Sequence, residues 1–70
     1  MQQKNFNLTI RQEQIITYLW DNLNRKEIAS RLKISTKTVD GHIHTIYKKY
    51  EVHTIPALFR KLLNEGWLKP

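Results

Sequence analysis

The feature that most restricts the fold of this chain is the recurrence of one local pattern, a helix-capping residue followed by apolar residues three or four positions apart. This spacing puts the apolar side chains on one face of an α-helix. Two glycines and two prolines are too few for an all-β domain with many tight turns. The sequence therefore predicts an all-α fold, and its 70 residues make at most one small domain.

Four polar residues are candidates for the N-caps of four helices, because their side chains can accept a hydrogen bond from the backbone of the first turn. Two of them also have the partner that a capping box requires, Gln12 three residues after Thr9 and Glu27 three residues after Asn24. Near the end of the chain, Gly66 stands where a C-cap glycine belongs. The four caps are Thr9, Asn24, Ser35 and Thr54, and the predicted helices cover about residues 10–22, 25–32, 36–50 and 55–66.

The second and third predicted helices are separated by about three residues, which is the spacing of a helix-turn-helix motif. Ala29 inside the second helix is small enough for the third helix to cross closely, and Ile34 can fill the corner between them. Helix pairs of this kind also occur in proteins that bind no DNA. The motif alone therefore leaves the function open.

The third predicted helix has one apolar face and one polar face. At about 100° per residue, the apolar face carries Val39, Ile43, Ile46 and Tyr50, and the opposite stripe carries Lys37, Gly41, His44 and Lys48. The flanks of the stripe carry Thr36, Asp40 and Tyr47 on one side and Thr38, Thr45 and Lys49 on the other. This distribution suits a helix that lies in a DNA major groove, with phosphate contacts outermost and base contacts central. The alternative is a basic face that is merely solvated.

Positive charge is concentrated in the centre of the chain. The sequence has twelve Lys and Arg against six Asp and Glu, a formal net charge of +6. Residues 25–49 contain seven basic residues (25, 26, 31, 33, 37, 48, 49) and two acidic ones (27, 40), so +5 of the +6 lies there. Such a balance favours an anionic partner such as nucleic acid or a membrane surface.

The chain resembles the LuxR-type (GerE-like) helix-turn-helix of bacterial transcriptional regulators over about residues 8–68. The matching motifs are L-T-x-R at Leu8–Arg11, K-E-I-A-x-x-L at Lys26–Leu32, I-S-x-K-T-V-D-x-H-I at Ile34–Ile43 and I-Y-K-K at Ile46–Lys49. The resemblance implies a four-helix DNA-binding domain at residues 8–70, after an N-terminal tail at residues 1–7. It also implies that the third helix is the recognition helix and that the fourth supports dimerisation on a two-fold symmetric DNA site.

The resemblance also implies roles for individual residues on double-stranded DNA. By position, Asp40, Gly41 and His44 occupy the family's main base-facing places. The residues expected near phosphates are Thr36, Lys37, Thr38, Thr45, Lys48 and Lys49. We expect Arg25 and Lys26 to bring backbone N–H groups and positive charge to a phosphate as well.

Three positions depart from the usual pattern of the family. Ile10 stands in place of Pro, Gln12 in place of Glu, and Ile55 in place of Arg. The last departure makes dimerisation less secure than DNA binding. We nevertheless predict a weak homodimer through an apolar surface of the fourth helix, the alternative being that all of these residues pack inward: Ile55, Leu58, Phe59, Leu62 and Leu63.

An acid and a glycine at the centre of a DNA-reading helix need an explanation. The missing side chain of Gly41 allows close approach to the groove, at a helix cost of about 1 kcal/mol relative to Ala. Asp40 can accept a hydrogen bond from a cytosine amino group, or it can pair with Lys37 or His44 one turn away.

Several other functions are disfavoured by the residues themselves. His42 and His44 point in nearly opposite directions on a helix, and there is no Cys, so no metal site is expected. No catalytic set and no phosphate-cradling glycine loop is present, so neither enzyme activity nor a cofactor is expected. The aromatic residues are expected in the core or an interface rather than stacked on single-stranded bases.

The chain also lacks the sequence features of membrane insertion. It has no signal-peptide core and no run of roughly 18 apolar residues, and the apolar side of the third helix is needed for folding. We therefore expect a cytoplasmic protein without membrane contact.

Two alternatives to a transcriptional regulator of this family remain. The fourth region of a sigma factor shares the K-E-I-A motif and the Ser-capped helix, but the T-V-D-x-H-I block and a fourth helix argue against it. A protein-interaction module that keeps the fold without DNA affinity is favoured by Asp40. A regulatory protein partner is compatible with either.

Overall fold

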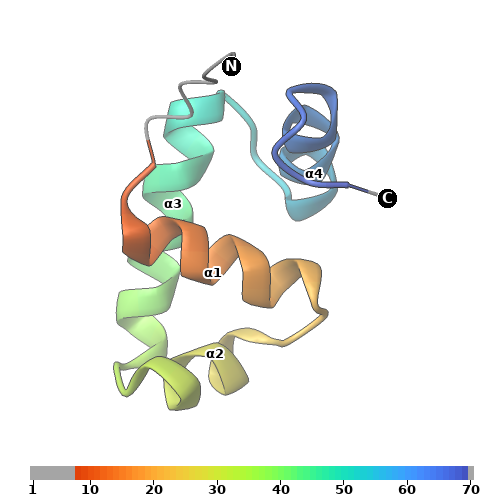
Figure 1. Ribbon diagram of the computed structural model, residues 1–70. Coiled ribbons are helices and arrows are strands. Elements are labelled where there is room, and N and C mark those ends of the chain that lie inside the picture. Colours follow the sequence, from red (N-terminus) through yellow and green to blue (C-terminus); the bar gives the residue numbers. More distant parts are fainter. Residues whose placement is uncertain (1–7, 70) are drawn as a thin grey trace.

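The computed structural model describes residues 8–69, which form four α-helices and no strand. The helices are α1 (Ile10–Trp20), α2 (Arg25–Leu32), α3 (Thr36–Tyr50) and α4 (Ile55–Asn64) (Figure 1). The predicted all-α class is confirmed. The predicted tail at residues 1–7 lies outside the described residues.

All four helices begin where their caps predict. Thr9 and Gln12 form a reciprocal capping box with two hydrogen bonds of 3.1 Å between backbone N–H and side-chain oxygen. Asn24 and Glu27 do the same at the start of α2, with distances of 2.8 Å. The side chains of Ser35 and Thr54 accept from backbone N–H groups three residues on, at 3.0 and 3.2 Å.

The helices end in a common way, which residue type indicates only at Asn22 and Gly66. Each is followed by a residue with positive φ, Asn22 (71°), Lys33 (59°), Glu51 (56°) and Gly66 (83°). The next residue is apolar in every case, and its N–H donates back across the last turn, from Leu23 to Tyr18, Ile34 to Ala29, Val52 to Tyr47 and Trp67 to Leu62, at 2.9–3.0 Å. These are Schellman motifs. They end α1 at Trp20 and α4 at Asn64, about two residues before the predicted ends.

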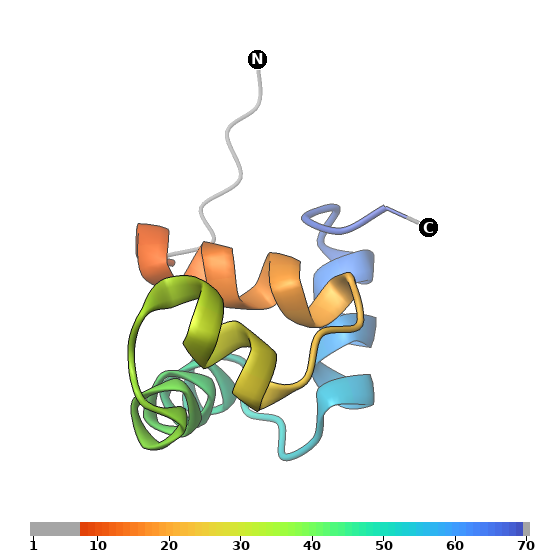
Figure 2. The same cartoon turned by 90° about the horizontal axis from the view of Figure 1, so that it is seen from below.

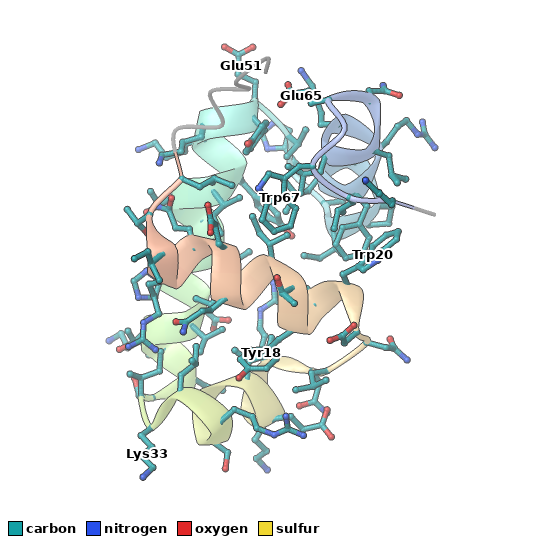
Figure 3. The ribbon with its side chains drawn as sticks, viewed as in Figure 1. Tyr18, Trp20, Lys33, Glu51, Glu65 and Trp67 are labelled. Atoms are coloured by element: carbon teal, nitrogen blue, oxygen red, sulfur yellow. The ribbon has the colours of Figure 1, made fainter. Side chains whose placement is uncertain are left out.

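Two of these left-handed residues bear long side chains, and both lie at the ends of α3. Figure 3 shows Lys33 at the turn before α3 and Glu51 at its far end. Left-handed backbone costs a non-glycine residue roughly 1–2 kcal/mol. The turn between α2 and α3 is therefore held by its hydrogen bonds and by the packing of Ile34 on the core.

Helix α3 packs against each of the other three helices. In Figure 1, α1 crosses α3, and α4 runs along the opposite side of the molecule; the view of Figure 2 shows the same separation. The core between the helices consists of Ile15, Ile16, Ile28, Ala29, Val39, Ile43, Ile46, Tyr50, Val52, Leu58, Leu62 and Leu68. One long face of α3 thus faces the core, and the other is left at the edge of the domain.

The structure corrects the predicted apolar surface of α4. Leu58 and Leu62 are 0% exposed and belong to the core, so they have no surface to offer a second subunit. Ile55 and Phe59 are half-buried, and Leu63 is 36% exposed. Part of the wide apolar arc is needed inside because a domain of this size has few other residues with which to fill its core.

The end of α1 meets α4 through aromatic side chains. The rings of Trp20 and Phe59 stack edge to face, with centroids 4.9 Å apart and an interplanar angle of 88°. Trp20 lies beside α4 in Figure 3, and Trp67 packs on the core as well. These aromatic residues pack in the core and between helices, as predicted from their helical spacing.

Candidate nucleic-acid interface

The two faces of α3 differ in exposure along their whole length. Val39, Ile43, Ile46 and Tyr50 are at most 8% exposed, whereas Lys37, Gly41, His44 and Lys48 are all exposed. The predicted division of α3 into an apolar face and an outward stripe is thereby confirmed. We call these four exposed residues the α3 stripe.

The first turn of α3 is ordered by its own hydroxyl groups. Ser35 Oγ accepts from the Thr38 N–H at 3.0 Å and lies 2.9 Å from Thr38 Oγ1. Thr36 and Lys37 follow the cap directly, in the part of a helix where backbone N–H groups have no partner within the helix. The exposed end of α3 thus combines a helix N-terminus with the charge of Lys37, both attractive to an anion.

The middle of the α3 stripe is bare. A Cβ atom built on Gly41 would meet nothing within 4 Å, so the packing of the domain does not require a glycine there. Thr45 Oγ1 donates to the Gly41 carbonyl at 3.1 Å, which uses the hydroxyl proton of Thr45 inside the helix. Neither the packing of the domain nor a positive φ therefore requires glycine at position 41. The missing side chain can matter only to a molecule that contacts this exposed surface.

Asp40 pairs with a residue of another helix. Its Oδ1 lies 2.7 Å from Nε of Arg25, the first residue of α2, with the two side chains 57% and 45% exposed. The alternative that Asp40 pairs with Lys37 or His44 is therefore wrong, because the crossing of α2 and α3 brings Arg25 closer. This contact could not be predicted from the sequence, because fifteen positions separate the two residues and no periodicity relates them.

Two other basic residues near the interface differ in their contacts. Lys26 is exposed at the start of α2 and makes no ion pair with Asp40. The ammonium of Lys49 donates to Gln12 Oε1 at 2.9 Å, so this lysine is tied to the start of α1. Gln12 is 5% exposed and uses the same oxygen for its capping box, a role that the sequence predicts without the link to Lys49.

Both acidic residues of the basic central stretch, residues 25–49, have a hydrogen-bond or ion-pair partner. Glu27 Oε1 accepts from the Asn24 N–H at 2.8 Å, and Asp40 is paired with Arg25. Among the bases, Arg31 lies over the ring of Tyr18, 5.9 Å from its centroid, on the side of α2 that meets α1. The positive charge of α3 consequently comes from Lys37 and Lys48 of its stripe and from Lys49 on the flank, whose partner Gln12 is neutral.

Neither a metal site nor a membrane span is found in the described part of the chain. Over residues 8–69, no three His, Cys, Asp or Glu side chains gather closely enough to hold an ion. No helix in that range is both long and apolar enough to cross a bilayer.

Comparison with known proteins gives consistent matches. A family model described as "Bacterial regulatory proteins, luxR family" matches residues 6–62. The "Uncharacterized response regulatory protein YgeK" of Escherichia coli (strain K12) is 39% identical over 59 residues, which cover 84% of this chain and 40% of that protein.

Two further relatives are regulators or fimbrial proteins by name. The "Transcriptional regulatory protein DesR" of Bacillus subtilis (strain 168) is 34% identical over 62 residues, 89% of this chain and 31% of that protein. The "Fimbriae Z protein" of Escherichia coli (strain K12) is 43% identical over 51 residues, 73% of this chain and 24% of that protein. The chain thus spans between about a quarter and two fifths of the length of these relatives.

Proposed function

The chain belongs to the luxR family of bacterial regulatory proteins, which regulate transcription by binding DNA, and from this premise we propose that α3 lies in the major groove of a specific duplex site. The observation that carries the proposal is the α3 stripe. An exposed row of two lysines, a histidine and a glycine stands opposite a fully apolar face. A helix of this kind fits the major groove, which admits an α-helix and presents a distinct pattern for each base pair.

The phosphate contacts that we propose lie around the edge of the stripe. Lys37 and Lys48 lie eleven residues, about three helical turns, apart on one face, so they reach the backbone near the two ends of α3. Arg25 and Lys26 at the start of α2, with Thr36 and Thr38 at the start of α3, would contact phosphates at one end. Thr45 and Lys49 complete the set, each exchanging an internal hydrogen bond for one to DNA.

The base contacts that we propose come from the second and third turns of α3. Gly41 lets the helix backbone approach the base edges, where Asp40 serves as an acceptor and His44 as a hydrogen-bonding group. The protein-interaction alternative drew its support from the charge of Asp40. Because that charge lies opposite Arg25 at 2.7 Å, it no longer counts against an anionic ligand.

We also propose that two copies bind a two-fold symmetric site as a weak dimer through α4. Leu63 is exposed, and Ile55 and Phe59 keep part of their surface accessible. Three partly exposed apolar residues make a small patch, so we expect association mainly on DNA. We place this activity in the cytoplasm, where the DNA of bacteria lies.

The test of the proposed function is the salt dependence of binding to duplex DNA. Affinity should fall steeply as salt rises, with a logarithmic slope of about −0.9 for each phosphate contacted. Lys37→Ala and Lys48→Ala should each weaken binding to all sequences and reduce the slope by roughly 0.9.

Lys61→Ala is the matched control, because Lys61 is exposed on α4, away from the α3 stripe. It should leave the slope unchanged. Equal effects of all three substitutions, or salt-insensitive binding, would contradict the proposal.

A further inference from the structure

We propose that Arg25 is a specificity-determining residue that acts through Asp40, holding its carboxylate as an acceptor for a cytosine amino group. This inference rests on the proposed function and deepens it. It assigns to Arg25 a second task, distinct from phosphate contact, and it names the base that the pair prefers. The observation that supports this inference is the 2.7 Å contact from Arg25 Nε to Asp40 Oδ1, which joins α2 to the exposed side of α3.

The contact with Arg25 fixes the position of the Asp40 carboxylate and leaves it able to accept a further hydrogen bond. Nε of Arg25 contacts Oδ1 of Asp40, and no other ion pair of either side chain is found within residues 8–69. A carboxylate has about four lone-pair sites on its two oxygens, so Asp40 keeps acceptor sites beyond this contact. An ionised carboxylate has only acceptor sites, and cytosine is the base that presents an isolated amino donor in the major groove. The chemistry therefore selects cytosine over guanine and thymine, whose corresponding groups are acceptors. It also disfavours adenine, whose amino donor stands beside the N7 acceptor and would bring the carboxylate against a second lone pair.

The contact with Arg25 also offsets the negative charge of Asp40. An unpaired carboxylate on α3 would be repelled by the phosphates on both sides of the groove. The guanidinium of Arg25 cancels this charge locally, and its terminal amino groups extend beyond the Nε that Asp40 uses. One arginine can therefore contact Asp40 and a phosphate at the same time, whereas Lys26, the next residue, can supply only charge to the backbone.

The strength of the pair should change on docking. Both side chains are about half exposed, and ion pairs in such surroundings add little to folding. Variants of either residue are accordingly expected to fold. Displacement of water by DNA lowers the effective dielectric around the pair, so that the coupling between Arg25 and Asp40 grows in the complex.

The experiment measures base preference with the whole chain and a library of randomised duplexes. The wild type should enrich cytosine at one position of each half-site by about tenfold over other bases, within the range of good base contacts. Asp40→Ala should abolish that preference. Arg25→Ala should reduce the preference at the same position at least threefold and also weaken binding overall.

Three comparisons separate positioning from simple charge. Lys26→Ala should weaken binding to all sequences and leave the cytosine preference intact. Arg25→Lys, which keeps a cation beside the carboxylate, should retain part of the preference. The double variant Asp40→Ala/Arg25→Ala should show the same base preference as Asp40→Ala alone.

Three outcomes would overturn the inference. The first is that Arg25→Ala behaves as Lys26→Ala does, with uniform weakening and unchanged base preference, which leaves the proposed function standing. The second is that the position affected by Asp40→Ala prefers a base other than cytosine. The third is a wild-type chain that enriches no duplex sequence, which would remove the proposed function and this inference together.

Discussion

Gly41 is the position at which the needs of folding and of the proposed DNA contact differ most. It lies in the interior of α3, where glycine is less favourable than alanine by about 0.5–1 kcal/mol because its backbone loses more freedom on folding. A Cβ atom at this site would meet nothing within 4 Å. Gly41→Ala should therefore stabilise the domain by about 0.5–1 kcal/mol. For a domain of this size, that corresponds to a rise in Tm of roughly 2–8 °C.

The same substitution should weaken DNA binding. If the backbone at Gly41 lies against base edges, an added methyl group must be accommodated in a closely packed contact. Overpacking of this kind costs about 1–3 kcal/mol, or roughly 5- to 150-fold in affinity. Gly41→Ala is thus expected to stabilise the fold and to weaken DNA binding. A loss of affinity therefore could not result from unfolding.

The assay pairs thermal denaturation, followed by circular dichroism, with titration of the selected duplex. Gly66→Ala is the matched control, because Gly66 has φ 83° and lies after α4. It should lower stability by about 1–2 kcal/mol and leave the affinity of the folded protein for DNA unchanged. A lower Tm for Gly41→Ala would refute the packing argument, and an unchanged affinity would refute close approach to the groove.

Three further predictions concern the core, the helix ends and pH. Leu62→Ala should destabilise the domain by about 2–5 kcal/mol, close to its whole stability, while Leu63→Ala should cost less than about 0.5 kcal/mol and reduce cooperative binding to two half-sites; equal melting temperatures would contradict this. Lys33→Gly should raise the free energy of unfolding in urea by about 0.5 kcal/mol, since it relieves left-handed backbone, and a decrease would be inconsistent with the Schellman turn. Burial, and secondarily the charge of Glu65, raises the pKa of Tyr50 above its usual 10.0. The stability that the protonated Tyr50 contributes is therefore present below pH 10 and is lost as pH rises through the raised pKa. Tyr50→Phe should make the free energy of unfolding in urea fall less steeply above pH 10, and an unchanged fall would contradict this role of Tyr50.

The starts of the helices and the two faces of α3 could be predicted because they depend on neighbouring residues. Asn24 and Glu27, for example, satisfy each other's backbone donors across three positions, whatever the rest of the chain does. The periodicity of α3 likewise determines which residues point the same way. The buried and exposed sides follow once the apolar side is placed inward.

The parts that could not be predicted depend on contacts between distant residues or on unusual backbone. Lys33 and Glu51 adopt left-handed conformations although neither is Gly or Asn, so no residue type marks those helix ends. The partner of Asp40 depends on how α2 crosses α3, which spacing along the chain does not specify. The apolar arc of α4 has a predictable width, but only the position of α4 decides that Leu58 and Leu62 face inward.

The most direct test of the central claim, that the outer side of α3 binds DNA, is an amide NMR titration of the whole chain with its selected duplex. If the outer side of α3 binds DNA, shift changes will concentrate in α3 from Thr36 to Lys48 and at the start of α2 around Arg25, and they will diminish as salt is raised. Smaller changes on α4 should appear only with a duplex that contains both half-sites. Changes confined to α4 with a single half-site, or changes in α3 that persist unaltered at high salt, would contradict the account.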